Sequence, residues 1–180
     1  MNVVVFGGSQ AEAGSYDYEQ ARDLGARLAR LGHVVITGGY MGIMEAASRG
    51  AHEAGGQVVG VTCDEIEAWR NVRHNPWVKE ERRRSTLFDR LQSLLHESDA
   101  AIALPGGPGT LAEIALMWNL MIVNALPPKL LILVGAGWKS IFEQMFKEFT
   151  NYIPDPQREL LYFADTVYTA VKLFKDTGAG

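Results

Sequence analysis

Three glycine-rich segments carry the clearest chemical signal in this chain of 180 residues. They are Gly7-Gly8-Ser9, Gly38-Gly39-Tyr40-Met41-Gly42 and Gly106-Gly107-Pro108-Gly109-Thr110, and each follows a short apolar run. Glycine lets the backbone approach a ligand closely and reach positive φ. The last two segments also run into helical patterns, and a helix start offers free N–H groups and a positive dipole end to a phosphate. The three together predict a phosphate site made by Gly8, Ser9, Gly38, Gly39, Gly42, Gly106, Gly107, Gly109 and Thr110. For any one segment, the alternative is that its glycines are required only by the geometry of a tight turn.

Other patterns for nucleotide, metal or nucleophile chemistry are weak. No G-x-G-x-x-G follows the first apolar run, which disfavours ordinary dinucleotide binding. In the segment 135–140, Trp138 separates the glycine from Lys139, so the spacing of a phosphate loop fails and Lys139 is expected to be solvated. The four histidines have no metal-like spacing among themselves or with Cys63, and we expect no metal site and no cofactor.

Composition limits the class of protein. The net charge of −4 gives no electrostatic footprint for DNA or RNA. The single cysteine rules out an intrachain disulfide and favours a reducing compartment. The first residues are typical of a strand rather than a signal peptide, and the most apolar stretch, 116–137, is too interrupted to span a bilayer. We therefore expect a soluble, cytoplasmic protein with no membrane partner.

The elements that must position these segments alternate along the chain. Apolar runs predict strands at 3–6, 34–36, 58–61, 100–104, 130–134 and, more weakly, 160–163. Helical patterns lie near 17–31, 42–54, 83–97, 110–122, 138–149 and 165–176. This order predicts an α/β fold over residues 1–180, a single Rossmann-like domain whose doubly wound parallel sheet has helices on both faces. The basic run 82–84 is expected to be a solvated helix start, with steering of an anionic ligand as the alternative. The irregular stretch 63–81 is expected to be either a lid or interface or an ordered surface excursion.

The run from Ser98 to Glu113 closely resembles the LOG family, the cytokinin riboside 5′-monophosphate phosphoribohydrolases that are often labelled lysine decarboxylases. The family pattern P-G-G-x-G-T-x-x-E is matched in full from Pro105 to Glu113, and the glycine turns at 7–9 and 38–42 are also similar to the family. The resemblance covers essentially the whole chain. No lysine lies in the glycine turns, so the Schiff base of a pyridoxal phosphate decarboxylase has no support.

The sequence departs from the family pattern at three points. Arg90 takes the arginine position of the family's Arg-Lys pair, but Leu91 stands where lysine is usual. Thr37 precedes Gly38-Gly39 in place of a third glycine, and Glu45 replaces another. These changes resemble a sister group, the molybdenum cofactor carrier proteins, which share the fold.

The resemblance implies hydrolysis of the N-glycosidic bond of a nucleoside 5′-monophosphate, such as AMP or a cytokinin riboside 5′-monophosphate. Glu113 would stabilise the oxocarbenium-like state and activate water, and Arg90 would orient that carboxylate or bind the anionic substrate. The rival function is a non-catalytic nucleotide or molybdenum-cofactor carrier. Glu113 could instead complete a capping box with Thr110, and Arg90 could be a structural ion-pair partner.

Family members are usually dimers, which implies a homodimer here as well. In the helix 110–122, Met117, Trp118, Met121 and Ile122 could form a second apolar face for a partner copy. Burial of the same side chains inside one chain is the alternative.

Overall fold

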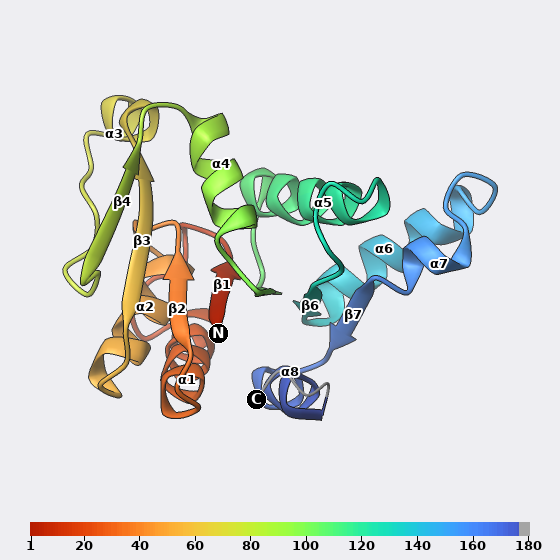
Figure 1. Ribbon diagram of the computed structural model, residues 1–180. Coiled ribbons are helices and arrows are strands. Elements are labelled where there is room, and N and C mark those ends of the chain that lie inside the picture. Colours follow the sequence, from red (N-terminus) through yellow and green to blue (C-terminus); the bar gives the residue numbers. More distant parts are fainter. Residues whose placement is uncertain (177–180) are drawn as a thin grey trace.

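The computed structural model describes residues 1–176, which build one sheet of seven strands flanked by helices (Figure 1). In chain order the elements are β1 (Asn2–Phe6), α1 (Tyr16–Arg30), β2 (Val34–Thr37), α2 (Ile43–Glu53), β3 (Val58–Cys63), α3 (Asp64–Arg70), β4 (Glu80–Arg84), α4 (Leu87–His96), β5 (Ala100–Ala103), α5 (Pro108–Ile122), β6 (Leu130–Val134), α6 (Ala136–Glu148), α7 (Asp155–Arg158), β7 (Leu161–Ala164) and α8 (Val167–Asp176).

The strand order is β4-β3-β2-β1-β5-β6-β7, and every neighbouring pair is parallel. The chain winds outward from β1 in one direction through β2 and β3, then returns to place β5 on the other side of β1. This is a doubly wound sheet whose topological switch point lies between β1 and β5. The predicted Rossmann-like fold class is confirmed.

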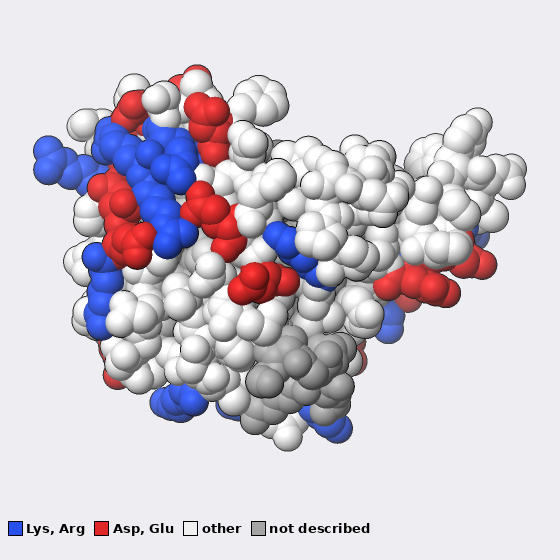
Figure 2. Space-filling view, viewed as in Figure 1, with Lys and Arg blue, Asp and Glu red and all other residues white. Residues whose placement is uncertain are grey.

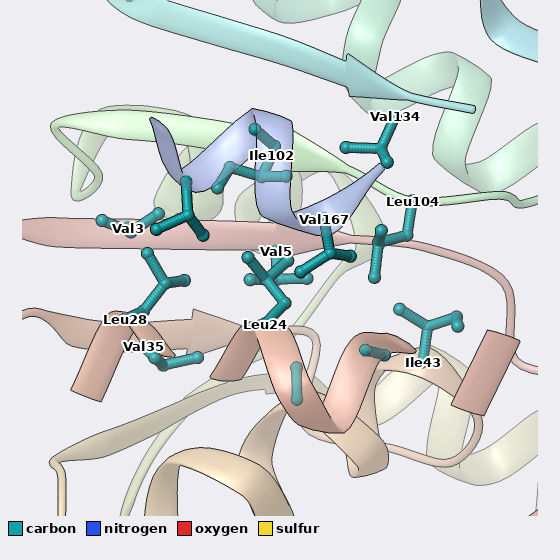
Figure 3. Close-up of a cluster of buried hydrophobic side chains, with 14 of the residues drawn as sticks. Val3, Val5, Leu24, Leu28, Val35, Ile43, Ile102, Leu104, Val134 and Val167 are labelled. Atoms are coloured by element: carbon teal, nitrogen blue, oxygen red, sulfur yellow. The ribbon is translucent and has the colours of Figure 1, made fainter. Parts of the chain in front are cut away.

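Alternate side chains of the central strand point to opposite faces of the sheet. Val3 and Val5 belong to a buried cluster shared with α1, α2 and α8, part of which is drawn in Figure 3. Val4 and Phe6 belong to a second cluster shared with α4, α5 and α6. Because both faces are covered, each strand near the centre is apolar at consecutive positions, which is the pattern that predicted these strands.

The prediction for residues 82–84 was wrong, because these arginines lie in β4 and not in a helix. β4 is an edge strand that pairs only with β3. Edge strands are often protected by charged side chains, and such a strand lacks the apolar signal of a buried one. Arg82 forms ion pairs with Glu80 and Glu97, and Arg83 with Asp64, so the arginine-rich patch over β4 in Figure 2 is interleaved with carboxylates.

The irregular stretch 63–81 holds the short helix α3, and residues 155–158 form α7; neither helix was predicted. α3 has seven residues and α7 has four, so both are too short to show a clear helical period in the sequence. In the part of the chain that the structure describes, no helix has the length and apolar character needed to cross a bilayer.

Three of the four residues predicted for a dimer face are buried within this chain. Met117, Trp118 and Met121 lie in the core beneath α5, and the Trp118 ring packs edge-on at 5.8 Å from the Phe142 ring of α6. The indole N–H of Trp118 donates to the Gln157 carbonyl at 2.7 Å. The alternative of burial inside the chain therefore accounts for these three side chains, and Ile122 is half-buried.

Candidate functional site

Two of the three glycine-rich segments meet at the switch point. The Gly8 amide, after β1, donates to the Pro105 carbonyl, after β5, at 3.0 Å. A side chain at Gly8 would lie 3.3 Å from the Gly106 Cα, so these two loops pack backbone against backbone. In open parallel sheets, ligands bind outside the carboxyl ends of the strands at this point.

The helix α5 begins directly after this contact. Its N-cap is Gly107, its first residue is Pro108, and no side chain caps it. A Cβ added at Gly107 or at Gly109 would meet no atom within 4 Å, and neither glycine has positive φ. Neither the local backbone nor the packing of the chain therefore requires glycine at these two positions. Glycine at both positions leaves the uncapped N–H groups at the start of α5 unobstructed.

Gly106 and Thr110 are held by the fold itself. A Cβ at Gly106 would lie 2.2 Å from the Thr110 Oγ1 and 2.9 Å from the Gly8 amide nitrogen. The Thr110 side chain is buried. Gly106 therefore lets the two loops close, while Thr110 packs beneath them and still borders the cavity described below.

The glycines of the second segment, Gly38, Gly39 and Gly42, contact residues around the cavity but do not line it. The Gly38 carbonyl accepts from Arg90, and the Gly39 carbonyl accepts from the backbone and side-chain amides of Asn75. Gly42, at φ 72°, precedes α2, whose first amide, on Ile43, donates to the Gly8 carbonyl at 2.9 Å. That helix end is thus covered by the β1–α1 loop. Gly38, Gly39 and Gly42 are absent from the cavity lining, although they were predicted to bind the nucleotide.

Arg90 and Glu113 come together across the switch point. The Arg90 guanidinium donates from Nε to the Val61 carbonyl at 2.8 Å and from Nη2 to the Gly38 carbonyl at 3.1 Å. Its remaining nitrogen, Nη1, lies 3.9 Å from the Glu113 Oε1, and both side chains are buried. Two strand ends therefore fix the guanidinium, and its free edge faces the carboxylate.

Glu113 is not a helix cap. The capping box required Thr110 at the N-cap, but the N-cap is Gly107, and Thr110 is the third residue of the helix. Glu113 lies one turn further along, where its side chain cannot reach the N-cap amide in capping-box geometry. Burial raises the pKa of the Glu113 carboxyl from 4.5 to about 7, and the nearby Arg90 charge opposes that rise. A buried carboxyl with a raised pKa that lines a cleft makes Glu113 a candidate functional residue.

Glu113 opens onto a cavity of about 600 Å³. That volume suits a ligand of nucleotide size. The β1 and β5 loops with the start of α5 contribute mostly small and polar residues, whereas α3 and the start of α4 contribute Ile66, Trp69 and Leu87 beside charged side chains. The lining residues are Gly7, Gly8, Ser9, Gln10, Tyr40, Met44, Glu65, Ile66, Trp69, Arg70, Leu87, Arg90, Gly107, Pro108, Gly109, Thr110 and Glu113.

The sequence did not single out the apolar and aromatic residues that line this cavity. Its apolar and aromatic residues come from the loop before α2, from α2, from α3 and from α4, and no single local spacing links all five of Tyr40, Met44, Ile66, Trp69 and Leu87. The nearest signal was the length of the stretch 63–81, which raised a lid as one alternative. Among residues 1–176, no group of three or more His, Cys, Asp or Glu side chains is placed to hold a metal ion.

Residues 1–127, well over half of the chain, match the sequence profile of the SLOG cluster4 family. The chain belongs to the SLOG cluster4 family. The matched region contains the whole of the site, from the β1 loop through Arg90 to Glu113. The resemblance to the LOG family noted from the Pro105–Glu113 motif is confirmed.

Two curated relatives of this SLOG cluster4 protein extend the match along the chain. A probable cytokinin riboside 5′-monophosphate phosphoribohydrolase of Oryza sativa subsp. japonica is 32% identical over 169 residues, which are 91% of this chain and 67% of the relative. A cytokinin riboside 5′-monophosphate phosphoribohydrolase of Arabidopsis thaliana is 30% identical over 178 residues, 96% of this chain and 80% of the relative.

Solved structures similar to this SLOG cluster4 protein include two of the sister group. The molybdenum cofactor binding protein of Rippkaea orientalis has a TM-score of 0.74 at 26% identity, covering 98% of this chain and 95% of that chain. The molybdenum cofactor carrier protein of Chlamydomonas reinhardtii has a TM-score of 0.72 at 25% identity, covering 99% and 98%.

Proposed function

We propose that this protein hydrolyses the N-glycosidic bond of a nucleoside 5′-monophosphate, AMP or a cytokinin riboside 5′-monophosphate, to the free base and ribose 5-phosphate. The observation that carries the proposal is the buried Glu113 carboxylate, which faces a nucleotide-sized cavity one helical turn from the uncapped start of α5. The names of the plant relatives, both phosphoribohydrolases, support the same reaction.

The phosphate has a matching position at the start of α5. The N–H groups of Gly107, Gly109 and Thr110 surround a helix end without a side-chain cap, where the dipole favours an anion. The second phosphate-side element is the β1 loop, where Gly8 and Ser9 also line the cavity. A phosphate held there places the ribose of the same nucleotide toward Glu113.

Glu113 would act on the bond between C1′ and the base nitrogen. As that bond breaks, its electron pair goes to the base, and positive charge develops at C1′, which a facing carboxylate stabilises. Water adds its hydroxyl to C1′ and gives its proton to Glu113, which passes the proton on to the leaving base. A pKa of about 7 suits both halves of this exchange at neutral pH.

Arg90 would position this carboxylate rather than bind the phosphate. Two of its nitrogens are already committed to the Val61 and Gly38 carbonyls, and the third faces Glu113. Its fixed positive charge favours the ionised carboxylate over the protonated one. The guanidinium thereby keeps a fraction of Glu113 charged in a site whose burial disfavours charge.

The test is release of ribose 5-phosphate. Incubation of the purified protein with AMP should yield adenine and ribose 5-phosphate in equal amounts, and adenosine, which lacks the phosphate, should be a poor substrate. A second candidate, a nucleotide or molybdenum-cofactor carrier, is favoured by the two solved structures described above. Binding of AMP with no release of ribose 5-phosphate would favour the carrier and reject hydrolysis.

We also propose that the protein is a cytoplasmic homodimer that binds no nucleic acid. Leu111, on α5, and Val123, the residue that follows α5, are 41% and 58% exposed, and Figure 2 shows few charges over this helix. We therefore propose that the two copies pair through the outer side of α5. The buried residues Met117, Trp118 and Met121, which the sequence suggested for this face, are not part of it.

A further inference from the structure

The side chain of Trp69 is unusual among the four tryptophans, because it borders the cavity and is 74% exposed. Trp118 and Trp138 are buried, and each indole N–H donates to a backbone carbonyl. Trp77 packs edge-on against His52 and under the Arg49 guanidinium. These three rings pack against other side chains of the fold, whereas most of the Trp69 ring is exposed to solvent.

The helix that carries Trp69 is tied down on its far side. Arg83 of β4 bridges to Asp64 at 2.6 Å and to Glu67 at 2.7 Å. Glu65 accepts from the Leu87 amide, the first of α4, at 2.7 Å. These contacts join α3 to β4 and α4. They hold α3 as a wall of the cavity, with Ile66, Trp69 and Arg70 among the lining residues.

One face of the Trp69 ring is covered by a cation. The Arg70 guanidinium carbon lies 4.7 Å from the ring centroid, and Arg70 also lines the cavity. Within residues 1–176, no other ring or cation packs on Trp69, and no carboxylate pairs with Arg70. The ring therefore keeps a second face for a planar partner, and a positive charge beside it suits an anionic ligand.

We propose that Trp69, backed by Arg70, is the stacking platform for the base of the bound nucleotide. The proposal rests on the proposed function, since it places the phosphate at the start of α5 and the base toward α3. The glycine-rich loops and the α3 wall, which contributes Ile66 and Trp69, line one cavity of nucleotide size, so a single nucleotide can contact both. Stacking of a base on an aromatic ring contributes to binding with any base, because every base has a π-face.

The experiment measures binding of two probes that differ only in the base. AMP and ribose 5-phosphate are titrated by calorimetry into a Glu113→Gln background, which prevents turnover of AMP during the titration. The variants are Trp69→Ala, Trp69→Phe and Arg70→Ala, and Trp77→Phe is the matched control because Trp77 lies outside the cavity lining. Tryptophan fluorescence is recorded in parallel, because stacking of a base on the indole quenches its emission.

Trp69→Ala should raise the Kd for AMP about ten-fold or more and leave the Kd for ribose 5-phosphate within about two-fold. Trp69→Phe should recover most of the AMP affinity but lose the quenching, and Trp77→Phe should keep both. Arg70→Ala should weaken AMP more than ribose 5-phosphate, since Arg70 backs the Trp69 ring at the base end of the cavity. An unchanged AMP affinity in Trp69→Ala, or an equal loss for both probes, would overturn the platform.

The same data separate this proposal from the proposed reaction. If the wild-type protein releases no ribose 5-phosphate but AMP quenches Trp69 and requires it for binding, hydrolysis fails and the platform stands. If hydrolysis proceeds and Trp69→Ala binds AMP normally, the platform fails alone. If AMP does not bind the wild-type protein at all, both are rejected.

Discussion

The Nη1 atom of Arg90 lies 3.9 Å from the Oε1 atom of Glu113, and the two side chains arrive from opposite sides of the sheet's switch point. Arg90 belongs to α4 but is anchored on the ends of β2 and β3, through the carbonyls of Gly38 and Val61. Glu113 belongs to α5, which follows β5 (Figure 1). The Arg90–Glu113 pair therefore depends on the order of the strands in the sheet. Changes at the ends of β2 and β3 or at the start of α5 should disturb it.

Gly38 gives the first prediction, because a Cβ there would lie 1.8 Å from the Arg90 Nη2 atom. Gly38→Ala should displace the guanidinium from Glu113 without adding a group to the cavity. We expect kcat for AMP to fall about ten-fold or more, because misplacement by roughly 1 Å can cost as much as 10²-fold. The matched control is Gly137→Ala in α6, where a Cβ meets nothing and activity should persist. Full activity in Gly38→Ala would refute the positioning role of Arg90.

Gly107 and Gly109 give the second prediction. A Cβ at either position meets no atom of the chain, so Gly107→Ala and Gly109→Ala should keep the melting temperature of the wild type or exceed it. The added methyl groups would crowd a phosphate on the α5 amides, and we expect KM for AMP to rise about ten-fold. Steady-state kinetics and thermal melts check both parts. An unchanged KM, or a phosphate found at residues 135–140 in ligand-soaked crystals, would move the phosphate site elsewhere.

The pKa of Glu113 gives a prediction about stability. Its folded value of about 7 exceeds its ordinary value of 4.5, so between these values the folded state binds more protons than the unfolded state. Stability should then fall as pH rises through this window, by up to about 3 kcal/mol for this group. Glu113→Gln removes the titration. Relative to the wild type, the variant should gain stability from pH 5 to pH 8 in urea unfolding; parallel pH curves would show that the carboxyl titrates normally.

The dimer gives a prediction about mass. Leu111 on α5 and Val123 directly after it are exposed to solvent, and light scattering at micromolar concentration should give about twice the chain mass of 19.8 kDa. Val123→Asp places a charge at the end of α5, outside the cavity lining, and should shift the protein toward the monomer. A monomeric mass for the wild type at this concentration would contradict the proposed homodimer.

Much of the fold was readable from the sequence because the inner strands are buried on both faces and therefore apolar throughout. β4 was not predicted, because it is an edge strand and its residues Glu80–Arg84 are all charged. The loops after β1 and β5, which meet at the switch point, were predictable from glycine at strand ends. The partners of Arg90 were not, since Val61 and Gly38 contribute only backbone carbonyls, which any residue possesses. The α3 wall was missed because α3 is only seven residues long, too short for its helical period to be recognised.

The most direct test of the central claim is the release of ribose 5-phosphate from AMP by the wild type and by Glu113→Gln. Glutamine keeps nearly the same size but cannot carry the negative charge or accept the proton from water. We predict that the variant binds AMP but loses activity by about 10²-fold or more, the scale of a lost acid–base group. Release of ribose 5-phosphate at the wild-type rate by Glu113→Gln would contradict the account, because the reaction would then proceed without the carboxylate on which it rests.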